Sequence, residues 1–337
     1  MPIISVSNLN KSYKILNKKE GFLGAIKDLV SNDYRYINAV NDLNLQIGKG
    51  EIVGFLGPNG AGKSTTIKML TGILKPTSGD ISINGFEPYS QRRNYVKGIG
   101  TVIGQRSQLW WDIPVIESFK ILKKIYKVSD ADYQAMLNRF EEQVGLSKLF
   151  NQSVRSLSLG QRMLCDIAAA FLHNPEVIFL DEPSIGLDVS VKRSMRQLIK
   201  ALNKDYQTTV VLTSHDMGDV ESLCERIVLI DKGKMIYDGE TAKFTKIFGD
   251  YRTLQLDVSG MSPEAQVVKL KDALSDLADI SIEPHGAFSS QITFRQDQIS
   301  LVSLLSKIQP KLEVEDFKVR EMDMESVIHK VYSGALA

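Results

Sequence analysis

The segment GPNGAGKS, from Gly57 to Ser64, carries the strongest chemical signal in this 337-residue chain. Its glycines let the backbone fold into a nest of N–H groups that bind phosphate oxygens. Lys63, expected as an exposed loop lysine, would place a positive charge on the β- and γ-phosphates of a nucleotide, and the Ser64 hydroxyl could ligate Mg²⁺. A plain glycine turn is the alternative, but an apolar strand precedes the segment and an amphipathic helix follows it. The residues expected to bind the nucleotide are Gly57, Pro58, Asn59, Gly60, Ala61, Gly62, Lys63, Ser64 and Thr65.

Two consecutive carboxylates follow an apolar run in VIFLDEP, residues 177–183. Open α/β sheets bind ligands at the carboxyl ends of their strands, which is where this pattern places Asp181 and Glu182. Asp181 is suited to hold Mg²⁺ or its water, and Glu182 to polarise an attacking water molecule. A strand that ends in Asp-Glu is also compatible with a helix N-cap. Together with the phosphate loop, the pair predicts hydrolysis of a nucleoside triphosphate.

A third segment, LSLGQ, spans residues 157–161 and precedes the carboxylate strand. Ser158 and Gln161 have the spacing of a capping box, which by itself would only begin a helix. The segment is also similar to LSGGQ, the signature of the ATP-binding cassette (ABC) family, with Leu159 in place of the first glycine. The resemblance implies that Ser158, Gly160 and Gln161 contribute to ATP binding.

Further matches to that family extend the resemblance over residues 1–240. Gln105, in IGTVIGQ, stands where the family has a glutamine that contacts Mg²⁺ or water. His215, in LTSHD, matches the histidine that holds the γ-phosphate and orients Glu182. GLD, residues 186–188, matches a loop that crosses the family's dimer interface. Tyr13 matches the aromatic residue that stacks on adenine, although Tyr34 and Tyr36 are rival candidates.

The resemblance implies a mechanism and a set of partners. Two cassettes pair head to tail, as a homodimer or with a related cassette, so that each ATP–Mg²⁺ lies between one phosphate loop and the other signature. Hydrolysis would then drive separately encoded transmembrane permease subunits from the cytoplasmic face of the cell membrane.

The elements that must position these residues alternate between strands and helices, which predicts an α/β fold with a mostly parallel sheet. The family resemblance makes this a P-loop NTPase cassette over residues 1–240, with an antiparallel part, a helical subdomain at 105–172 and an insertion at 14–38. The insertion carries apolar residues at helical spacing over 21–30, although a solvated loop is the alternative. Residues 241–337 read as βαββαβ followed by a helix, a small ferredoxin-like α+β domain.

Two regions bear on the branch of the family. Trp110 and Trp111 lie close to Gln105, in a segment that the family uses to meet its membrane partner, although core burial is the alternative. Together with the insertion and the C-terminal domain, the pair resembles bacterial type-two exporters of the daunorubicin-resistance and viologen-export type. We therefore expect export of a drug-like, lipid-like or cell-surface molecule.

Composition bears on which other classes of protein this chain could belong to. The formal net charge is +1, which gives no reason to expect a nucleic-acid partner. The alternative function is that of a soluble ABC ATPase acting on ribosomes or DNA, but this chain has one cassette and no long coiled-coil insertion. No apolar run reaches the ~18 residues of a membrane span. Cys165 and Cys224 are expected to be buried, reduced thiols.

Overall fold

The computed structural model describes residues 2–16, 34–104, 107–214, 217–248, 251–258, 260–277, 280–286, 289–321 and 331. The chain divides into two compact units, Met1–Thr241 and Ala242–Ala337.

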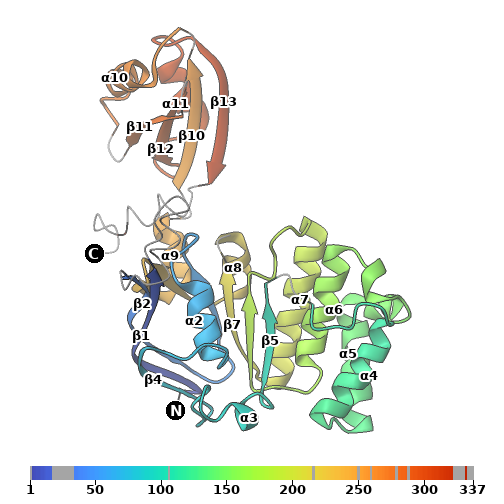
Figure 1. Cartoon of the computed structure of the whole chain (residues 1–337). Coiled ribbons are helices and arrows are strands. Elements are labelled where there is room, and N and C mark those ends of the chain that lie inside the picture. Colours follow the sequence, from blue (N-terminus) through green and yellow to red (C-terminus); the bar gives the residue numbers. More distant parts are fainter. Residues whose placement is uncertain are drawn as a thin grey trace, which may run out of the picture. The chain divides into compact units, whose positions relative to one another are not determined.

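A mixed sheet forms the centre of the first unit (Figure 1). Its strands, in spatial order, are β5 (Ile99–Ile103), β6 (Val177–Asp181), β7 (Thr209–Ser214), β3 (Ile52–Leu56), β8 (Arg226–Asp231) and β9 (Lys234–Glu240). All neighbouring pairs are parallel except β8 and β9. Every residue of β6 and β7 is buried, because helices or a second sheet cover both faces of these strands.

A second, antiparallel sheet has the order β2-β1-β4 and comprises β1 (Ile4–Leu16), β2 (Tyr34–Ile47) and β4 (Ser78–Ile83). Helix α2 (Lys63–Leu70) packs between the two sheets. Its residues Ile67 and Leu70 share one hydrophobic core with Leu9 of β1 and Phe55 of β3. This packing fixes the start of α2 against the end of β3.

The predicted insertion at 14–38 begins and ends inside the antiparallel sheet. Tyr13 pairs with Ile37, and Lys14 pairs with Tyr36, so β1 and β2 extend beyond the expected strands. The polar sequence of this stretch is compatible with a solvated loop, but strand pairing needs only backbone groups and tolerates polar side chains at a solvated edge. The helix predicted over 21–30 lies outside the described residues.

Helices α4 (Val115–Tyr126), α5 (Asp130–Val144), α6 (Leu159–Phe171) and α7 (Val189–Tyr206) lie beyond β5 (Figure 1). Phe119 and Leu122 of α4 are buried, whereas Ile125, which follows them at helical spacing, is 60% exposed. Ile125 lies in the last turn of α4, where the helix extends past the core. Cys165 and Cys224 are buried and free. Shorter helical segments are α3 (Arg92–Tyr95), η1 (Leu146–Leu149), η2 (Val154–Ser156), α8 (Met217–Leu223) and α9 (Thr241–Phe248).

The second unit contains an antiparallel sheet with the order β11-β12-β10-β13. Its elements follow the order β10 (Tyr251–Val258), α10 (Pro263–Ala273), β11 (Ser281–His285), β12 (Ser289–Arg295), α11 (Leu301–Ile308) and β13 (Val314–Glu321). Leu254, Ile292, Phe294 and Leu304 are buried in its own core. This is the ferredoxin-like arrangement. The terminal helix predicted after β13 falls in a stretch of which only residue 331 is described.

Candidate active site

The phosphate loop connects the end of β3 to the start of α2. Gly57 and Gly62 have φ values of 154° and 108°, in the region that disfavours side chains. A Cβ on Gly57 would lie 2.2 Å from the carbonyl oxygen of Ile230, and one on Gly62 would lie 2.4 Å from that of Ala39. Both glycines are therefore required by backbone conformation and by space. The positive end of α2 faces this loop.

Lys63 lies at the first position of α2 and is only 4% exposed, which corrects the expectation of an exposed loop lysine. Its Nζ donates hydrogen bonds to the carbonyl oxygens of Gly57 (2.7 Å) and Pro58 (3.1 Å). Burial lowers the pKa of Lys63, and the Glu182 carboxylate, 3.7 Å away, opposes that shift. The ammonium is thus held inside the loop, next to the carboxylate expected to act on water.

Asp181 and Glu182 lie where β6 ends, as predicted. The buried Asp181 carboxylate accepts hydrogen bonds from Ser64 Oγ (3.1 Å) and Thr213 Oγ1 (2.6 Å). The backbone N–H of Glu182 donates to Thr213 Oγ1 at 2.9 Å. Glu182 has a φ of 52°, and its side chain is 21% exposed. The two adjacent carboxylates therefore occupy different environments.

The oxygen atoms of Ser64 and Asp181 are a suitable donor pair for Mg²⁺. This ion prefers hard oxygen ligands and is commonly held by one or two protein groups together with substrate phosphates. Among the described residues, no cluster of three or more His, Cys, Asp or Glu side chains could hold a metal. Ser64 and Asp181 lie beside the phosphate loop, so their oxygen atoms suit an ion that is also held by nucleotide phosphates.

The signature segment lies at the start of α6, away from these contacts. Ser158 caps the helix, and Ser158 and Gln161 form both hydrogen bonds of a capping box. Gly160 packs against α7, where a Cβ would meet Val191 at 2.9 Å. Within the described part of the chain, no hydrogen bond or ion pair joins Ser158, Gly160 or Gln161 to the phosphate loop. Within one chain, the signature segment and the phosphate loop are therefore not joined by hydrogen bonds or ion pairs of these three residues.

The remaining predicted site residues differ in where the structure places them. Gln105 and His215 lie outside the described residues. Asn59 and Gly60 are exposed on the phosphate loop, whereas Ala61 is buried. Of the adenine-stacking candidates on β1 and β2, Tyr13 is half-buried, Tyr34 is 37% exposed and Tyr36 is 67% exposed.

Sequence reasoning missed Thr213 and Asp166. Thr213 of β7 lies opposite Asp181 of β6 and precedes Ser214 and His215. The sequence could have indicated Thr213 because both residues stand at the ends of predicted neighbouring strands. Asp166 of α6 accepts hydrogen bonds from Ser107 Oγ (2.9 Å) and Gln108 N (3.0 Å). Burial raises the pKa of Asp166 to about 6. No sequence motif indicates that residue, because its partners lie in a distant loop.

Comparisons with known proteins agree with this geometry. Residues 40–185 match the protein family described as ABC transporter. NatA, an ABC transporter ATP-binding protein of Bacillus subtilis, is 33% identical over 61% of this chain and 83% of its own length. The linearmycin resistance ATP-binding protein LnrL of the same organism is 32% identical over 72% of this chain and 77% of its own length. ABC transporter A family member 1 of Dictyostelium discoideum is 34% identical over 68% of this chain, but the match spans only 26% of that longer protein.

Solved structures support the same fold. The dimeric cassette MJ0796 bound to ADP and Pi is 26% identical, with a TM-score of 0.58 over 71% of this chain and 98% of that one. CbiO1 from Clostridium perfringens, part of the ABC transporter complex cbiONQ, is 25% identical, with a TM-score of 0.59 over 74% of this chain and 91% of that one.

The phosphate loop, the carboxylates at the end of β6 and the signature segment at the start of α6 all lie in one fold. That fold is shared with the ATP-binding cassettes, a class of nucleotide-hydrolysing proteins. The chain belongs to the family of ABC transporter ATP-binding proteins, and its cassette is an ATP-binding ATPase domain of that family.

Proposed function

We propose that this chain powers an exporter as one of two cassettes docked to separately encoded membrane permease subunits. The observation that carries the proposal is the grouping of Lys63, Ser64, Asp181 and Glu182 around the phosphate loop. Two named relatives support the role: LnrL is a resistance protein, and CbiO1 is part of a transporter complex. No described helix has the length and apolar character needed to cross a membrane.

In the proposed reaction, Lys63 binds the β- and γ-phosphate oxygens, exchanging its bonds with the Gly57 and Pro58 carbonyls for stronger charged ones. Ser64 and Asp181 would hold Mg²⁺, which neutralises phosphate charge when it is bound. Glu182 accepts a proton from the attacking water as the water oxygen bonds to the γ-phosphorus. The bond between that phosphorus and the β–γ bridging oxygen breaks, so that ADP leaves and inorganic phosphate is formed. The Thr213 hydroxyl donates to the Asp181 carboxylate and accepts from the Glu182 backbone N–H, so it orients the Asp181 side chain and fixes the Glu182 main chain. Gln105 and His215 are proposed to complete this site.

Ser158, Gly160 and Gln161 would act on the ATP held by a second cassette. This assignment is supported by their separation from the phosphate loop within one chain and by the dimeric state of MJ0796. The second cassette is either another copy or a related chain. The cytoplasmic face of the membrane is the proposed location, and nucleic acid is not a proposed partner.

Reconstitution with a permease tests the transport role. The chain is co-expressed with the membrane proteins encoded beside it and purified with them into lipid vesicles. We expect ATP-dependent uptake of a transported compound into inside-out vesicles, and loss of uptake with Glu182→Gln. ATP hydrolysis by a chain that forms no complex with any neighbouring membrane protein, yet associates with ribosomes or DNA, would favour the soluble alternative.

A further inference from the structure

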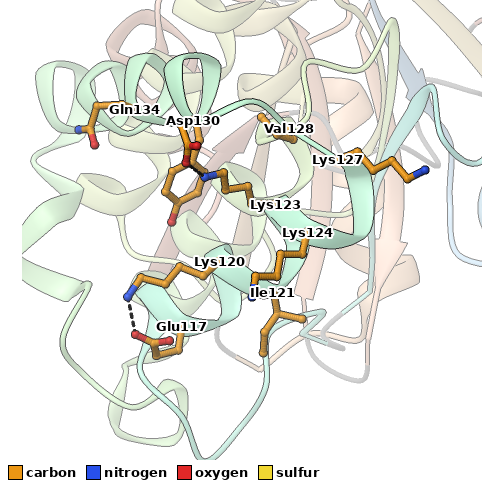
Figure 2. A pocket seen from close by; sticks show the side chains of 10 residues that line it. Glu117, Lys120, Ile121, Lys123, Lys124, Lys127, Val128, Asp130 and Gln134 are labelled. Carbon is orange, nitrogen blue, oxygen red and sulfur yellow. Dashed lines mark hydrogen bonds and ion pairs between the residues drawn. The ribbon is translucent and has the colours of Figure 1, made fainter.

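A pocket of about 690 Å³ opens between α4 and α5, and none of the phosphate-loop residues lines it (Figure 2). Four lysines, Lys120, Lys123, Lys124 and Lys127, contribute to its wall from α4 and the residue that follows it. Figure 2 shows Asp130 facing them from the start of α5. The nucleotide site does not account for this concentration of ammonium groups.

The positive charge of this wall is only partly neutralised. Glu117 pairs with Lys120 at 2.7 Å, and Asp130 pairs with Lys123. Glu117 and Lys120 are each about half exposed, so their pair contributes little and can exchange for another anion. Within the described residues, Lys124 and Lys127 have no carboxylate partner. Four lysines against two lining carboxylates leave two excess positive charges.

Tyr133 provides an independent sign of a ligand at the same pocket. Its side chain lines the pocket and is only 8% exposed, yet its hydroxyl has no hydrogen-bond partner among the described residues. A buried donor without an acceptor is costly and rare in native proteins. Burial raises the pKa of Tyr133 to about 12, so the hydroxyl remains a donor at neutral pH. The Lys123 ammonium lies 4.9 Å from the centre of the same ring.

These groups define the chemistry of a suitable ligand. Several ammonium donors and one hydroxyl donor match a group that is anionic and carries several acceptor oxygens. A phosphate ester offers more acceptor oxygens than a carboxylate, and a lysine ammonium binds it as a point charge. Ile121 and Val128 add apolar lining. We propose that the pocket between α4 and α5 binds a phosphate ester, from a lipid headgroup or from a soluble metabolite.

Two probes distinguish the sources of the phosphate ester. Full-length protein is sedimented with vesicles of phosphatidylcholine alone or mixed with phosphatidylglycerol. Glycerol 3-phosphate is titrated calorimetrically into the Lys63→Ala variant, so that the nucleotide site does not contribute. Binding only to phosphatidylglycerol vesicles assigns the pocket to a lipid, and binding only to glycerol 3-phosphate assigns it to a soluble ester.

In either arm, Lys120→Ala with Lys124→Ala should weaken binding about tenfold or more, since each lysine contributes substantially to anion attraction. The matched control is Lys97→Ala with Lys148→Ala, two exposed lysines outside the pocket, which should change binding less than about twofold. Equal losses in both double variants would show diffuse charge attraction and overturn the proposal. Failure of both probes to bind would overturn it as well.

Tyr133→Phe separates a binding role from a structural one. Because the Tyr133 hydroxyl has no hydrogen-bond partner in the part of the chain that the structure describes, its removal should leave the melting temperature unchanged or raise it. The same variant should bind the preferred probe about tenfold more weakly, as expected for a lost hydrogen bond to a charged group. Unchanged binding by Tyr133→Phe would contradict the assignment of this hydroxyl to the ligand.

Discussion

Adjacent residues can acquire different chemistry from their surroundings, as Asp181 and Glu182 do. Asp181 is 6% exposed and accepts hydrogen bonds from two hydroxyl groups, which fix the orientation of its carboxylate. Glu182 has a left-handed backbone and lies 3.7 Å from Lys63. A non-glycine residue in that conformation is strained, and such strain often occurs at functional sites. The geometry therefore favours Glu182 as the residue that meets water.

Glu182→Gln should retain ATP binding but slow steady-state hydrolysis at least ~10²-fold, because a positioned base contributes about that much. The amide keeps the size of the side chain and cannot accept the proton. Phosphate release and ATP binding are measured on the same preparation. Asp238→Asn, a carboxylate paired with Arg226 away from the loop, serves as a control with normal turnover. Near-normal turnover by Glu182→Gln would exclude it as the base.

Lys63→Ala should weaken ATP binding and abolish hydrolysis, since no other residue of the loop carries positive charge toward the phosphates. Its burial means that the substitution also removes two hydrogen bonds to loop carbonyls. We expect a loss of unfolding free energy of about 1–2 kcal/mol rather than unfolding. Calorimetric titration with ATP and a thermal melt measure the two effects. An unaltered ATP affinity would show that phosphates bind elsewhere.

At the scale of elements, the segment between β5 and α4 presents two aromatic rings on a fixed backbone. Trp110 is 40% exposed and Trp111 is 50% exposed. Trp110 N donates to Ser118 Oγ, and Trp111 O accepts from Arg155 N. Rings with this exposure do not fit the core-packing alternative. An exposed apolar surface on a backbone that is fixed by hydrogen bonds is typical of a site that binds a partner protein.

Replacing both Trp110 and Trp111 with Ala should leave the ATPase rate of the isolated chain nearly unchanged and abolish co-purification with the permease. Full burial of a tryptophan would make its loss cost about 3–5 kcal/mol, so a much smaller change in unfolding free energy is expected here. Phe317→Ala, at an exposed aromatic residue of β13, is the matched control. A large drop in melting temperature with loss of ATPase would instead identify core residues.

Hydrogen bonds to Asp166 connect α6 to Ser107 and Gln108. Because the pKa of Asp166 is raised, the stability that this residue contributes depends on pH. The folded state binds the proton more tightly than the unfolded state, whose carboxyl has the ordinary value of 3.8. Unfolding free energy from this group therefore falls as pH rises from about 4 to about 6. Asp166→Asn can keep both hydrogen bonds through Oδ1 without the charge.

The Asn variant should therefore become more stable than the wild type by an amount that grows across this window. The gain should reach on the order of 1–3 kcal/mol and then level off. Urea unfolding of both proteins at several pH values measures it. A stability difference that does not vary with pH would contradict a titrating Asp166.

At the scale of the whole molecule, the separation of the signature from the phosphate loop predicts association. Glu182→Gln with ATP should form a stable dimer, because bound ATP would be shared between two chains and would not be consumed. Light scattering with and without ATP measures the mass. Lys63→Ala, which should not retain ATP, is expected to remain monomeric. If Glu182→Gln also stays monomeric at saturating ATP, the result counts against ATP sites shared between two copies of this chain, and pairing with a related cassette would give the same result.

The sequence by itself determined the parts of this protein that depend on local order along the chain. A glycine-rich loop between an apolar strand and a helix, paired carboxylates after an apolar run, and a capping box each depend on neighbouring residues. The ferredoxin-like order of the second unit was predictable for the same reason, since periodicity reports which elements follow one another.

Only the tertiary structure decided how distant residues meet. Ser64, Asp181 and Thr213 share hydrogen bonds because β7 lies between β6 and β3, and α2 follows β3, a strand order that no local pattern specifies. The same holds for burial: Lys63 is enclosed although it was expected in an exposed loop, and the apolar Ile125 is exposed in the last turn of its helix. Side-chain periodicity describes one element, whereas exposure depends on every element packed against it.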